Sequence, residues 1–344
     1  MLGVTFYFLV ILGFASSIRA STAVLGNPPV LSFEEGYTEL FGDRNVMILR
    51  DGRTVHLSLD ERTGAGFVSQ DLYLHGFFSA SIKLPADYTA GVVVAFYDWL
   101  LLQMSNGDIF ETTHDELDFE FLGNVRGKEW RIQTNVYGNG STGIGREERY
   151  GLWFDPAEDF HHYSILWTDY QIIFYVDNIP IREIKRTEAM GGVFPSKPMS
   201  LYATIWDGST WATSGGRYKV NYKYAPFIAE FSDLVLRGCA VDPIEQSSRQ
   251  CDDGHEDLSR LSETGALIML DQQSMMTEFR MKHMTYSYCY DRVRYPTPLP
   301  ECAIDLRKAG RLRESSWVKF GGVHGLHGKR RRHRSSSRGT TLLS

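Results

Sequence analysis

One ten-residue segment, HDELDFEFLG from His114 to Gly123, alternates polar and apolar residues. Successive side chains of a β-strand point to opposite faces, so the alternation places the polar residues on one face and the apolar residues on the other. Like charges at neighbouring positions destabilise a strand. Aligned carboxylates therefore indicate a functional role, with a solvated edge strand as the alternative. The polar face carries His114, Glu116, Asp118 and Glu120.

The spacing of Glu116 and Glu120 suits a mechanism with two carboxylates. At about 3.3 Å per residue their Cα atoms lie ~13 Å apart, and side chains that lean inward leave the carboxyl groups roughly 5 Å apart. That separation fits retaining cleavage of a glycoside, in which one carboxylate attacks the anomeric carbon and the other protonates the leaving oxygen. Asp118, between them, can hydrogen-bond the nucleophile and raise the pKa of a neighbouring acid.

Calcium binding is the competing interpretation of these carboxylates. A straight row on a strand cannot wrap an ion, and the oxygen-rich loop of a calcium site is absent from the sequence. We therefore predict neither a metal nor a cofactor.

The elements that must position this strand are themselves strands. From about Ser32 to Leu236 the sequence consists of short alternating or aromatic-rich runs separated by Gly, Pro, Asn and Asp. This pattern is typical of an antiparallel sandwich or jelly roll, so we predict an all-β domain over residues 30–236. A smaller region, residues 237–302, contains all the cysteines and a predicted helix from about Ser259 to Lys282.

The two ends of the chain of 344 residues differ from the body. The apolar start, MLGVTFYFLVILGFA, is too short to span a bilayer and predicts a secretory signal peptide over residues 1–21. Residues 303–344 hold eleven Lys or Arg against Asp305 and Glu314, and this basic tail is predicted to be disordered. We expect a secreted, soluble monomer with no membrane anchor after cleavage and no nucleic-acid partner.

The segment HDELDFEFLG closely resembles the active-site signature of the xyloglucan endotransglucosylase/hydrolases, a plant branch of glycoside hydrolase family 16. Further matches cover about residues 30 to 302 and include QTNVYGNGS, FHHYSILW, IIFYVDNIPIR, PMSLYATIWDGSTWAT and YCYDRVRYP. The resemblance implies a concanavalin-like β-jelly roll with a C-terminal extension held by two disulfides. By position, Glu116 would be the nucleophile, Glu120 the general acid/base, and Asp118 the helper between them.

Other polar and aromatic residues are candidates for binding sugar. In WRIQTNVYG, Gln133 and Asn135 share one strand face, and the matching family residues touch the donor sugar; a polar outer face is the alternative. Trp206 and Trp211 offer flat surfaces for pyranose rings, although a core role is the alternative. The assigned substrate-binding set is His114, Gln133, Asn135, Trp206, Trp211, Arg294 and Tyr295, the last two at a family position near the acceptor subsites.

The four cysteines permit three connectivities. The local pairs close loops of about a dozen residues and would clip an extension that has no large core of its own. We therefore predict a Cys239–Cys251 and a Cys289–Cys302 disulfide.

The chain departs from the family pattern at two places. Six residues, Asp98 through Gln103 (DWLLLQ), are inserted after Tyr97. The usual glycosylation sequon after the catalytic motif is missing, and the one N-x-S/T sequon in the chain lies at Asn139.

The resemblance implies a cell-wall enzyme of the apoplast that cleaves the β-1,4-glucan backbone of xyloglucan and transfers it to a xyloglucan chain end or oligosaccharide. A strict xyloglucan endohydrolase and a catalytically silent carbohydrate-binding protein are the alternatives. Contact of the basic tail with acidic pectin is a further hypothesis.

Overall fold

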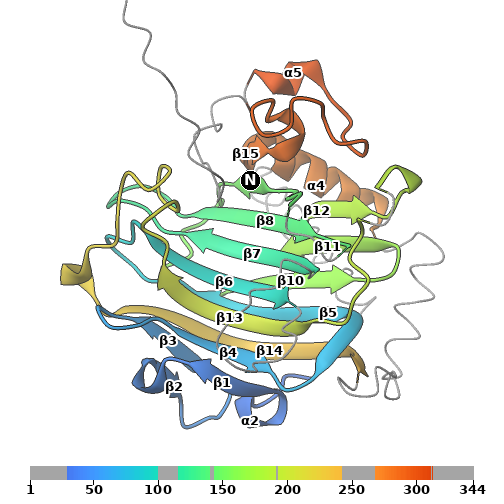
Figure 1. Ribbon diagram of the computed structural model, residues 1–344. Helices are drawn as coiled ribbons and strands as arrows, with labels where there is room; N and C mark the ends of the chain where they lie inside the picture. The colour runs from blue at the N-terminus through green and yellow to red at the C-terminus, as the bar shows by residue number, and fades with distance from the viewer. Residues whose placement is uncertain are drawn as a thin grey trace, which may run out of the picture.

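The computed structural model describes residues 29–99, 115–139, 143–190, 193–241, 268–310 and 312. They form two antiparallel β-sheets that pack face to face (Figure 1). The first sheet has eight strands, in the order β1 (Tyr37–Phe41), β4 (Ala65–Ser69), β13 (Ser200–Asp207), β6 (Val92–Trp99), β7 (Glu116–Leu122), β8 (Arg131–Tyr137), β9 (Glu148–Tyr150) and β15 (Met284–Ser287).

The second sheet has seven strands. Their order is β12 (Ile179–Lys185), β11 (Gln171–Val176), β10 (His161–Trp167), β5 (Leu72–Lys83), β14 (Phe227–Val241), β3 (Val55–Leu59) and β2 (Val46–Ile48). Short helical segments lie between strands: α2 (Phe33–Gly36), η1 (Asp43–Asn45), η2 (Glu188–Met190) and η3 (Tyr222–Tyr224). The predicted all-β sandwich is confirmed.

The core lies between the sheets and explains why β7 is fixed in place. Leu117, Phe119 and Phe121 are fully buried, as the alternation of the sequence predicts. The ring of Phe121 meets the edge of Tyr163 on β10 at 4.7 Å between centroids, and Phe119 meets Phe174 on β11 at 5.3 Å. These contacts across the sandwich orient the polar face of β7 outward from the core.

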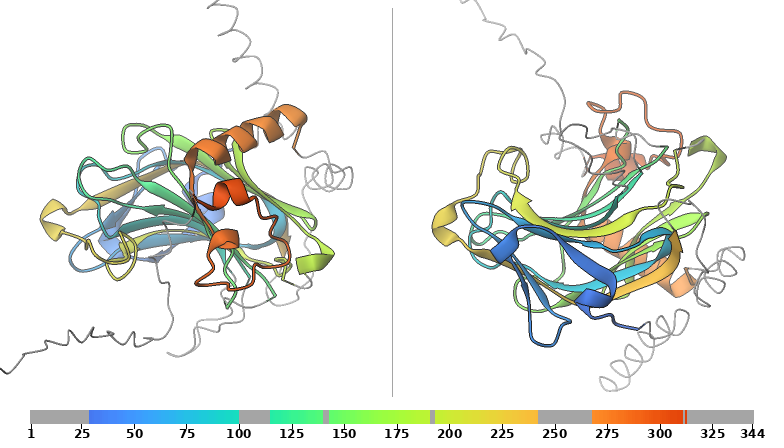
Figure 2. Two further views of the ribbon diagram at one scale, coloured as in Figure 1. Left: turned by 90° about the horizontal axis from the view of Figure 1, so that it is seen from above. Right: turned by 60° about the horizontal axis from the view of Figure 1, so that its bottom comes forward.

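The C-terminal extension lies along the β9 edge of the eight-stranded sheet and adds a strand to it (Figures 1 and 2). It contains α4 (Leu270–His283), β15, η4 (Tyr288–Tyr290) and α5 (Leu306–Ala309). The Cys289–Cys302 disulfide is confirmed. Cys239 is also disulfide-bonded, while its predicted partner Cys251 lies outside the described residues.

The helix of the extension begins later than the sequence predicted. Met269 has an extended backbone, and its N–H donates to the side-chain oxygen of Gln272 at 3.1 Å, so α4 starts at Leu270 instead of continuing from Ser259. The residues from Ser259 to position 267 lie outside the description.

The structure places two boundaries later than the sequence predicted, one at the end of the sandwich and one at the end of the extension. β14 pairs with β5 as far as Val241, beyond the expected end of the sandwich at Leu236. The first residues of the basic tail are ordered, since they form α5 and Leu312 is buried against the core. The predicted signal peptide and residues 313–344 lie outside the described residues.

Candidate active site

The outer face of β7 carries the three predicted carboxylates. Asp118 is buried, whereas Glu116 and Glu120 are half-buried, so both glutamates keep access to a bound molecule. The strand is anchored at its start by Asp115, whose Oδ2 accepts hydrogen bonds from the backbone N–H groups of Ser196 at 2.7 Å and Lys197 at 3.0 Å. His114, assigned to the same face, lies outside the described residues.

Strand β8 places an amide opposite two of the carboxylates. Gln133 pairs with Glu120 and Asn135 with Asp118 in the antiparallel register. The Nε2 group of Gln133 donates to Oε2 of Glu120. The other face of β8 is in the core, where Ile132 and Val136 are fully buried, so the two amides are turned toward the site by the alternation of the strand.

Strand β6 supplies an aromatic residue that the sequence reasoning missed. Tyr97 pairs with Asp118 and stacks on Tyr202 of β13 at 5.3 Å between ring centroids. Burial, with smaller effects from the charge of Glu116 and from Tyr202, raises the pKa of Tyr97, so its hydroxyl stays protonated and able to donate. Tyr97 lies just before the DWLLLQ insertion. Its position opposite Asp118 follows from the pairing of β6 with β7, which the sequence alone does not show.

The electrostatics of the row favour a protonated acid. Burial first, and then the charge of Glu147, raise the pKa of Glu120 to about 8, although the hydrogen bond from Gln133 lowers it. Burial and repulsion from Glu116 and Glu120 also raise the pKa of Asp118, and a hydrogen bond between the carboxyls of Asp118 and Glu116 acts in the same direction. Asp118 and Glu120, which both follow Glu116 on the same strand face, are thus neutral acids.

Strand β9 and the residue before it contribute two charged side chains, Arg149 and Glu147, that the sequence reasoning also missed. Arg149 donates from Nε to Oε1 of Gln133 at 2.7 Å and from Nη2 to Oε1 of Glu147. Both side chains are buried, with exposures of 8% for Arg149 and 2% for Glu147. The alternation in GREERYG was the available signal, but three strand residues are too few to be recognised as a strand.

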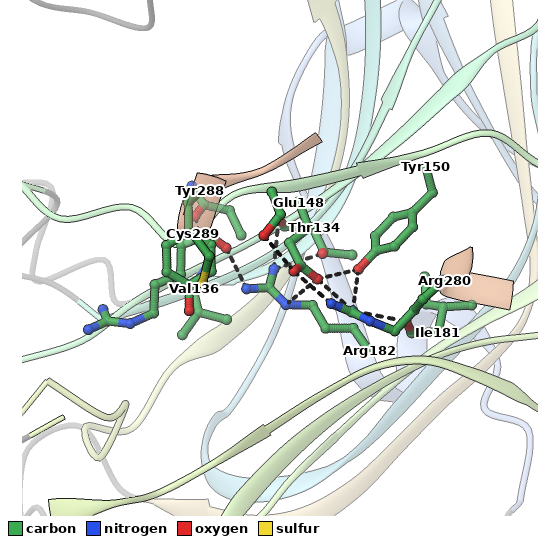
Figure 3. Close-up of polar contacts among 12 residues, drawn as sticks. Thr134, Val136, Glu148, Tyr150, Ile181, Arg182, Arg280, Tyr288 and Cys289 are labelled. Atoms are coloured by element: carbon green, nitrogen blue, oxygen red, sulfur yellow. Dashed lines mark hydrogen bonds and ion pairs between the residues drawn. The ribbon is translucent and has the colours of Figure 1, made fainter. Parts of the chain in front are cut away.

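The opposite face of β9 carries a second buried carboxylate, Glu148, which makes a different set of contacts (Figure 3). Arg280 of α4 donates two hydrogen bonds to its oxygens, at 2.7 and 2.8 Å, and the Tyr150 hydroxyl donates a third at 2.5 Å. Arg182, from β12 of the other sheet, lies 3.4 Å from it and also donates to the Oγ1 of Thr134 at 2.8 Å. Although burial alone would raise it, these cations lower the pKa of Glu148 to about 2.

The aromatic pair predicted to bind sugar lies at the end of β13. Trp206 and Trp211 are 5.6 Å apart between centroids and tilted against each other, and they pack partly buried on Val93 and Leu122. Val93 of β6 pairs with Leu122 of β7, and Leu122 is two residues after Glu120. The two rings pack on this pair and therefore lie close to the end of β7 that carries Glu120. The structure thus brings the pair near the carboxylate row.

The remaining predicted residues lie in the extension and in the loop after β8. Arg294 donates from Nη1 to Oε2 of Glu147 at 3.1 Å, and the Tyr295 hydroxyl donates to the backbone oxygen of Gly145 at 2.6 Å. Asn139 is exposed and has a positive φ of 61°, although the Ser141 of its sequon lies outside the described residues. The structure records no glycan, so glycosylation of Asn139 stays a prediction.

Within the described residues, no cluster of three or more His, Cys, Asp or Glu side chains has the arrangement of a metal site. None of the helices in that part of the chain combines the length and the hydrophobicity needed to span a bilayer.

A two-sheet antiparallel sandwich with paired glutamates on one outward strand face is the architecture of a glycoside-cleaving jelly roll, and the comparisons agree. Residues 33–224 match the family model described as glycosyl hydrolases family 16, and residues 267–302 match the model of the xyloglucan endo-transglycosylase C-terminus. The chain belongs to the xyloglucan endotransglucosylase/hydrolases of this family.

The similarity to relatives from Arabidopsis thaliana extends over nearly the whole chain. It is 64% identical to the probable xyloglucan endotransglucosylase/hydrolase protein 27 of Arabidopsis thaliana, with 93% of each chain covered. It is 60% identical to the probable protein 28 of the same family and organism, with 96% of each covered. Xyloglucan endotransglucosylase/hydrolase protein 2 of that plant is 44% identical, over 79% of this chain and 89% of its own.

Proposed function

We propose that the protein cleaves the β-1,4-glucan backbone of xyloglucan and transfers the glycosyl fragment to another xyloglucan chain by a retaining double displacement. The observation that carries the proposal is the outward row of β7. Glu116 follows the backbone anchor at Asp115, the neutral acid Asp118 comes two residues after Glu116, and Glu120 comes two residues after Asp118. The relatives named above carry this activity in their names.

In the first step Glu116 acts as the nucleophile. Its carboxylate oxygen bonds to the anomeric carbon while the bond from that carbon to the leaving oxygen breaks, and Glu120 transfers its proton to that oxygen. The raised pKa of Glu120, about 8, keeps this proton in place at neutral and acidic pH. Asp118, neutral and hydrogen-bonded to Glu116, orients the attacking carboxylate.

In the second step Glu120, now ionised, takes a proton from the hydroxyl of the acceptor sugar. That oxygen bonds to the anomeric carbon, and the ester bond to Glu116 breaks, which restores both carboxyl groups. A sugar acceptor gives transfer and water gives hydrolysis. Gln133 and Asn135 on β8, with Trp206 and Trp211 on the β13 side, are the proposed sugar-binding residues, and Arg294 and Tyr295 lie on the acceptor side in the extension.

The test is incubation of the purified protein with xyloglucan and a labelled xyloglucan oligosaccharide. We expect label to enter polymer faster than new reducing ends appear, because the acceptor competes with water for the intermediate. Reducing ends without labelled polymer would make the protein a strict endohydrolase. Retention on xyloglucan with neither product would make it a silent carbohydrate-binding protein, and mixed-linkage glucan tested as donor in parallel checks the substrate class.

Localisation and partners follow from the sequence as proposals. We infer a secreted, monomeric protein of the plant cell wall, because the chain starts with a predicted signal peptide. The cluster of Lys329, Arg330, Arg331, Arg332 and Arg334 supports electrostatic contact with acidic pectin. Such contact is screened by salt, with a Debye length of about 8 Å near physiological strength. Retention of the full chain, but not of a chain ending after Leu312, on a polygalacturonate column at low salt would support it, and equal elution would contradict it.

A further inference from the structure

A continuous chain of polar contacts leads from the extension to the candidate acid/base. Arg294 donates to Oε2 of Glu147 at 3.1 Å, and Arg149 donates to the other oxygen of the same carboxylate. Arg149 also donates to Oε1 of Gln133 at 2.7 Å, and Gln133 donates to Glu120. The contact between Arg149 and Glu147 is local to β9, and each of the other links joins two different parts of the fold.

The inner links of this chain are shielded from water, since Gln133 is 1% exposed and Glu147 is 2% exposed. Arg294, at the outer end, is partly exposed, and Gly145 lets it come close, since a Cβ there would lie 2.7 Å from its Nη2. Breaking a buried charged pair is costly, because the remaining charge is left without compensation. The buried Glu147 therefore favours keeping its two arginine partners.

The direction of each hydrogen bond is fixed by chemistry. A guanidinium only donates, so the amide oxygen of Gln133 must face Arg149 and its NH₂ group must face Glu120. Oε2 of Glu120 is thus an acceptor, and when Glu120 is protonated its proton resides on Oε1. The cation on β9 in this way selects the oxygen from which the acid donates.

The extension also determines where β9 lies. Its contacts cover three consecutive residues around the start of β9: Arg146 pairs with Glu301 at 2.6 Å, Glu147 with Arg294, and Glu148 with Arg280. The backbone N–H of Tyr288 also donates to the backbone oxygen of Glu147 at 2.9 Å. β9 itself pairs with β8 over three residues only. Figure 3 shows that Arg280 and Arg182 converge on Glu148.

We propose that the C-terminal extension positions the acid/base Glu120 through Arg294, Glu147, Arg149 and Gln133, which makes Arg294 and Glu147 positioning residues for proton transfer. This inference rests on the proposed function, because it assigns a role within that site. The extension thus contributes to breaking the donor bond as well as to accommodating the acceptor.

The groups that face Glu120 determine the sign of the pH effect. They are Glu116 and Asp118 of β7, Glu147 just before β9, and Arg149 of β9, while Arg294 of the extension contacts Glu147. Glu147 raises the pKa of Glu120, whereas Arg149 lowers it. Neutralising Glu147 should therefore move the basic limb of the pH–rate profile to lower pH, and removing Arg294 should move it to higher pH.

The experiment compares Arg294→Gln, Arg294→Lys and Glu147→Gln in the full chain, with Arg307→Gln of the same extension as matched control, since Arg307 is exposed and pairs only with its neighbour Asp305 among the contacts described. We expect Arg294→Gln to lower kcat on xyloglucan about tenfold to a hundredfold through misplacement of the acid. Arg294→Lys should restore part of it, and the two Gln variants should shift the basic limb in opposite directions.

An activated donor separates positioning from a general loss of structure. A nitrophenyl glycoside of a xyloglucan oligosaccharide has a leaving group that needs no proton, so its pre-steady-state burst should be nearly unchanged in both Gln variants. Equal losses on both donors, or an unshifted pH profile, would overturn the proposal. A change confined to the KM for acceptor would also overturn it and would leave Arg294 as an acceptor-binding residue.

The proposed function fails in a different way. If the wild-type protein gives neither labelled polymer nor reducing ends from xyloglucan, the function and with it this proposal are wrong. If the wild-type protein is active and Arg294→Gln behaves as Arg307→Gln does, only the positioning role is wrong. Should Arg294→Gln unfold at the assay temperature, Glu147→Gln decides the question, because it keeps the volume and the hydrogen-bonding capacity of the side chain.

Discussion

Asp118 and Glu120 on β7 and Glu148 on β9 are all carboxylic acids affected by burial, but the pKa values of the β7 pair and of Glu148 move in opposite directions. Glu148 faces two guanidinium groups and a phenol that donates, and its pKa is lowered to about 2. Glu120 faces Glu147 and Glu116, and its pKa is raised to about 8. Burial alone therefore does not make a reactive acid. The sign of the neighbouring charges decides whether a buried carboxylate stabilises the fold or holds a proton.

A single short strand serves both regions. Glu147, just before β9, and Glu148, its first residue, are consecutive, so their side chains point to opposite faces, one toward the site and one toward the core. The cations on the core face come from β12 and from α4, which are far apart in the sequence. The same arrangement that anchors the extension thus fixes the charged residues beside the acid/base.

The largest effect is expected from the β7 row. Glu116→Gln should lower turnover of xyloglucan at least roughly 10³-fold, because the two-step route has no first step without a nucleophile. The thermal midpoint should change little, since Glu116 is half-buried and faces other acids. Label transfer and reducing-end assays measure the first effect, and thermal unfolding followed by circular dichroism measures the second.

Asp118→Asn is the matched variant for this assignment. It keeps the shape and a hydrogen-bond donor toward Glu116, so it should retain more activity than Glu116→Gln. Near-native turnover in Glu116→Gln together with a strong loss in Asp118→Asn would show that the roles of these two residues have been exchanged.

The next effect is on stability. Glu148→Gln leaves the buried Arg182 and the partly buried Arg280 without their counter-charge, and breaking a buried pair in this way costs about 3–5 kcal/mol of unfolding free energy. Urea denaturation at neutral pH measures the loss. Glu278→Gln is the control, because Glu278 pairs with Lys282 on the exposed side of α4 and its removal should leave the midpoint unchanged.

The pH dependence of the same variant sharpens the comparison. The pKa of Glu148 is lowered from an ordinary 4.5 to about 2, so its stabilising contribution is present above pH 4.5 and is lost as the pH falls toward 2. The wild-type protein should lose stability over that range more steeply than Glu148→Gln. Parallel curves for the two proteins would contradict the assignment of Glu148 as the ionised partner of the two arginines.

Local patterns predicted the sandwich and the β7 row because alternation is a property of neighbouring residues. HDELDFEFLG shows which side chains share a face, and the structure places Leu117, Phe119 and Phe121 in the core as that pattern requires. The pairing of Cys289 with Cys302 was also accessible, since the two residues are close in sequence.

The partners of the row were not accessible in this way. Arg149 and Glu147 reach the site because β9 pairs with β8, and β9 is held there by residues that follow it in the sequence by more than 130 positions, such as Arg280 and Ser287. Glu301, 155 positions from Arg146, is a further case. Contacts of this separation depend on topology, which no local pattern of charges specifies.

The smallest effect concerns another buried carboxylate, Asp98, which belongs to neither group. It is 1% exposed, neither of its oxygens has a hydrogen-bond partner among the residues that the structure describes, and it lies on the core face of β6 between Leu117 of β7 and Leu201 of β13. Burial raises its pKa well above the ordinary value of 3.8, and no cation offsets the effect. It is the first residue of the DWLLLQ insertion, so an acid stands at a position that the surrounding core favours for an apolar side chain.

Asp98→Leu should therefore stabilise the protein. A buried polar group without a partner costs about 1–3 kcal/mol, and removing it should recover a gain of that order at neutral pH. Because the pKa of Asp98 is raised in the folded state, its cost grows as the pH rises above 3.8, so the gain should be larger at pH 7 than near pH 4. Urea denaturation at both pH values measures it, with Asp98→Asn as the control that keeps a polar group. A variant that is less stable than the wild type at pH 7, or a gain that grows toward acid pH, would show that Asp98 has a cationic or hydrogen-bonding partner and belongs with Glu148 instead of standing apart from both groups.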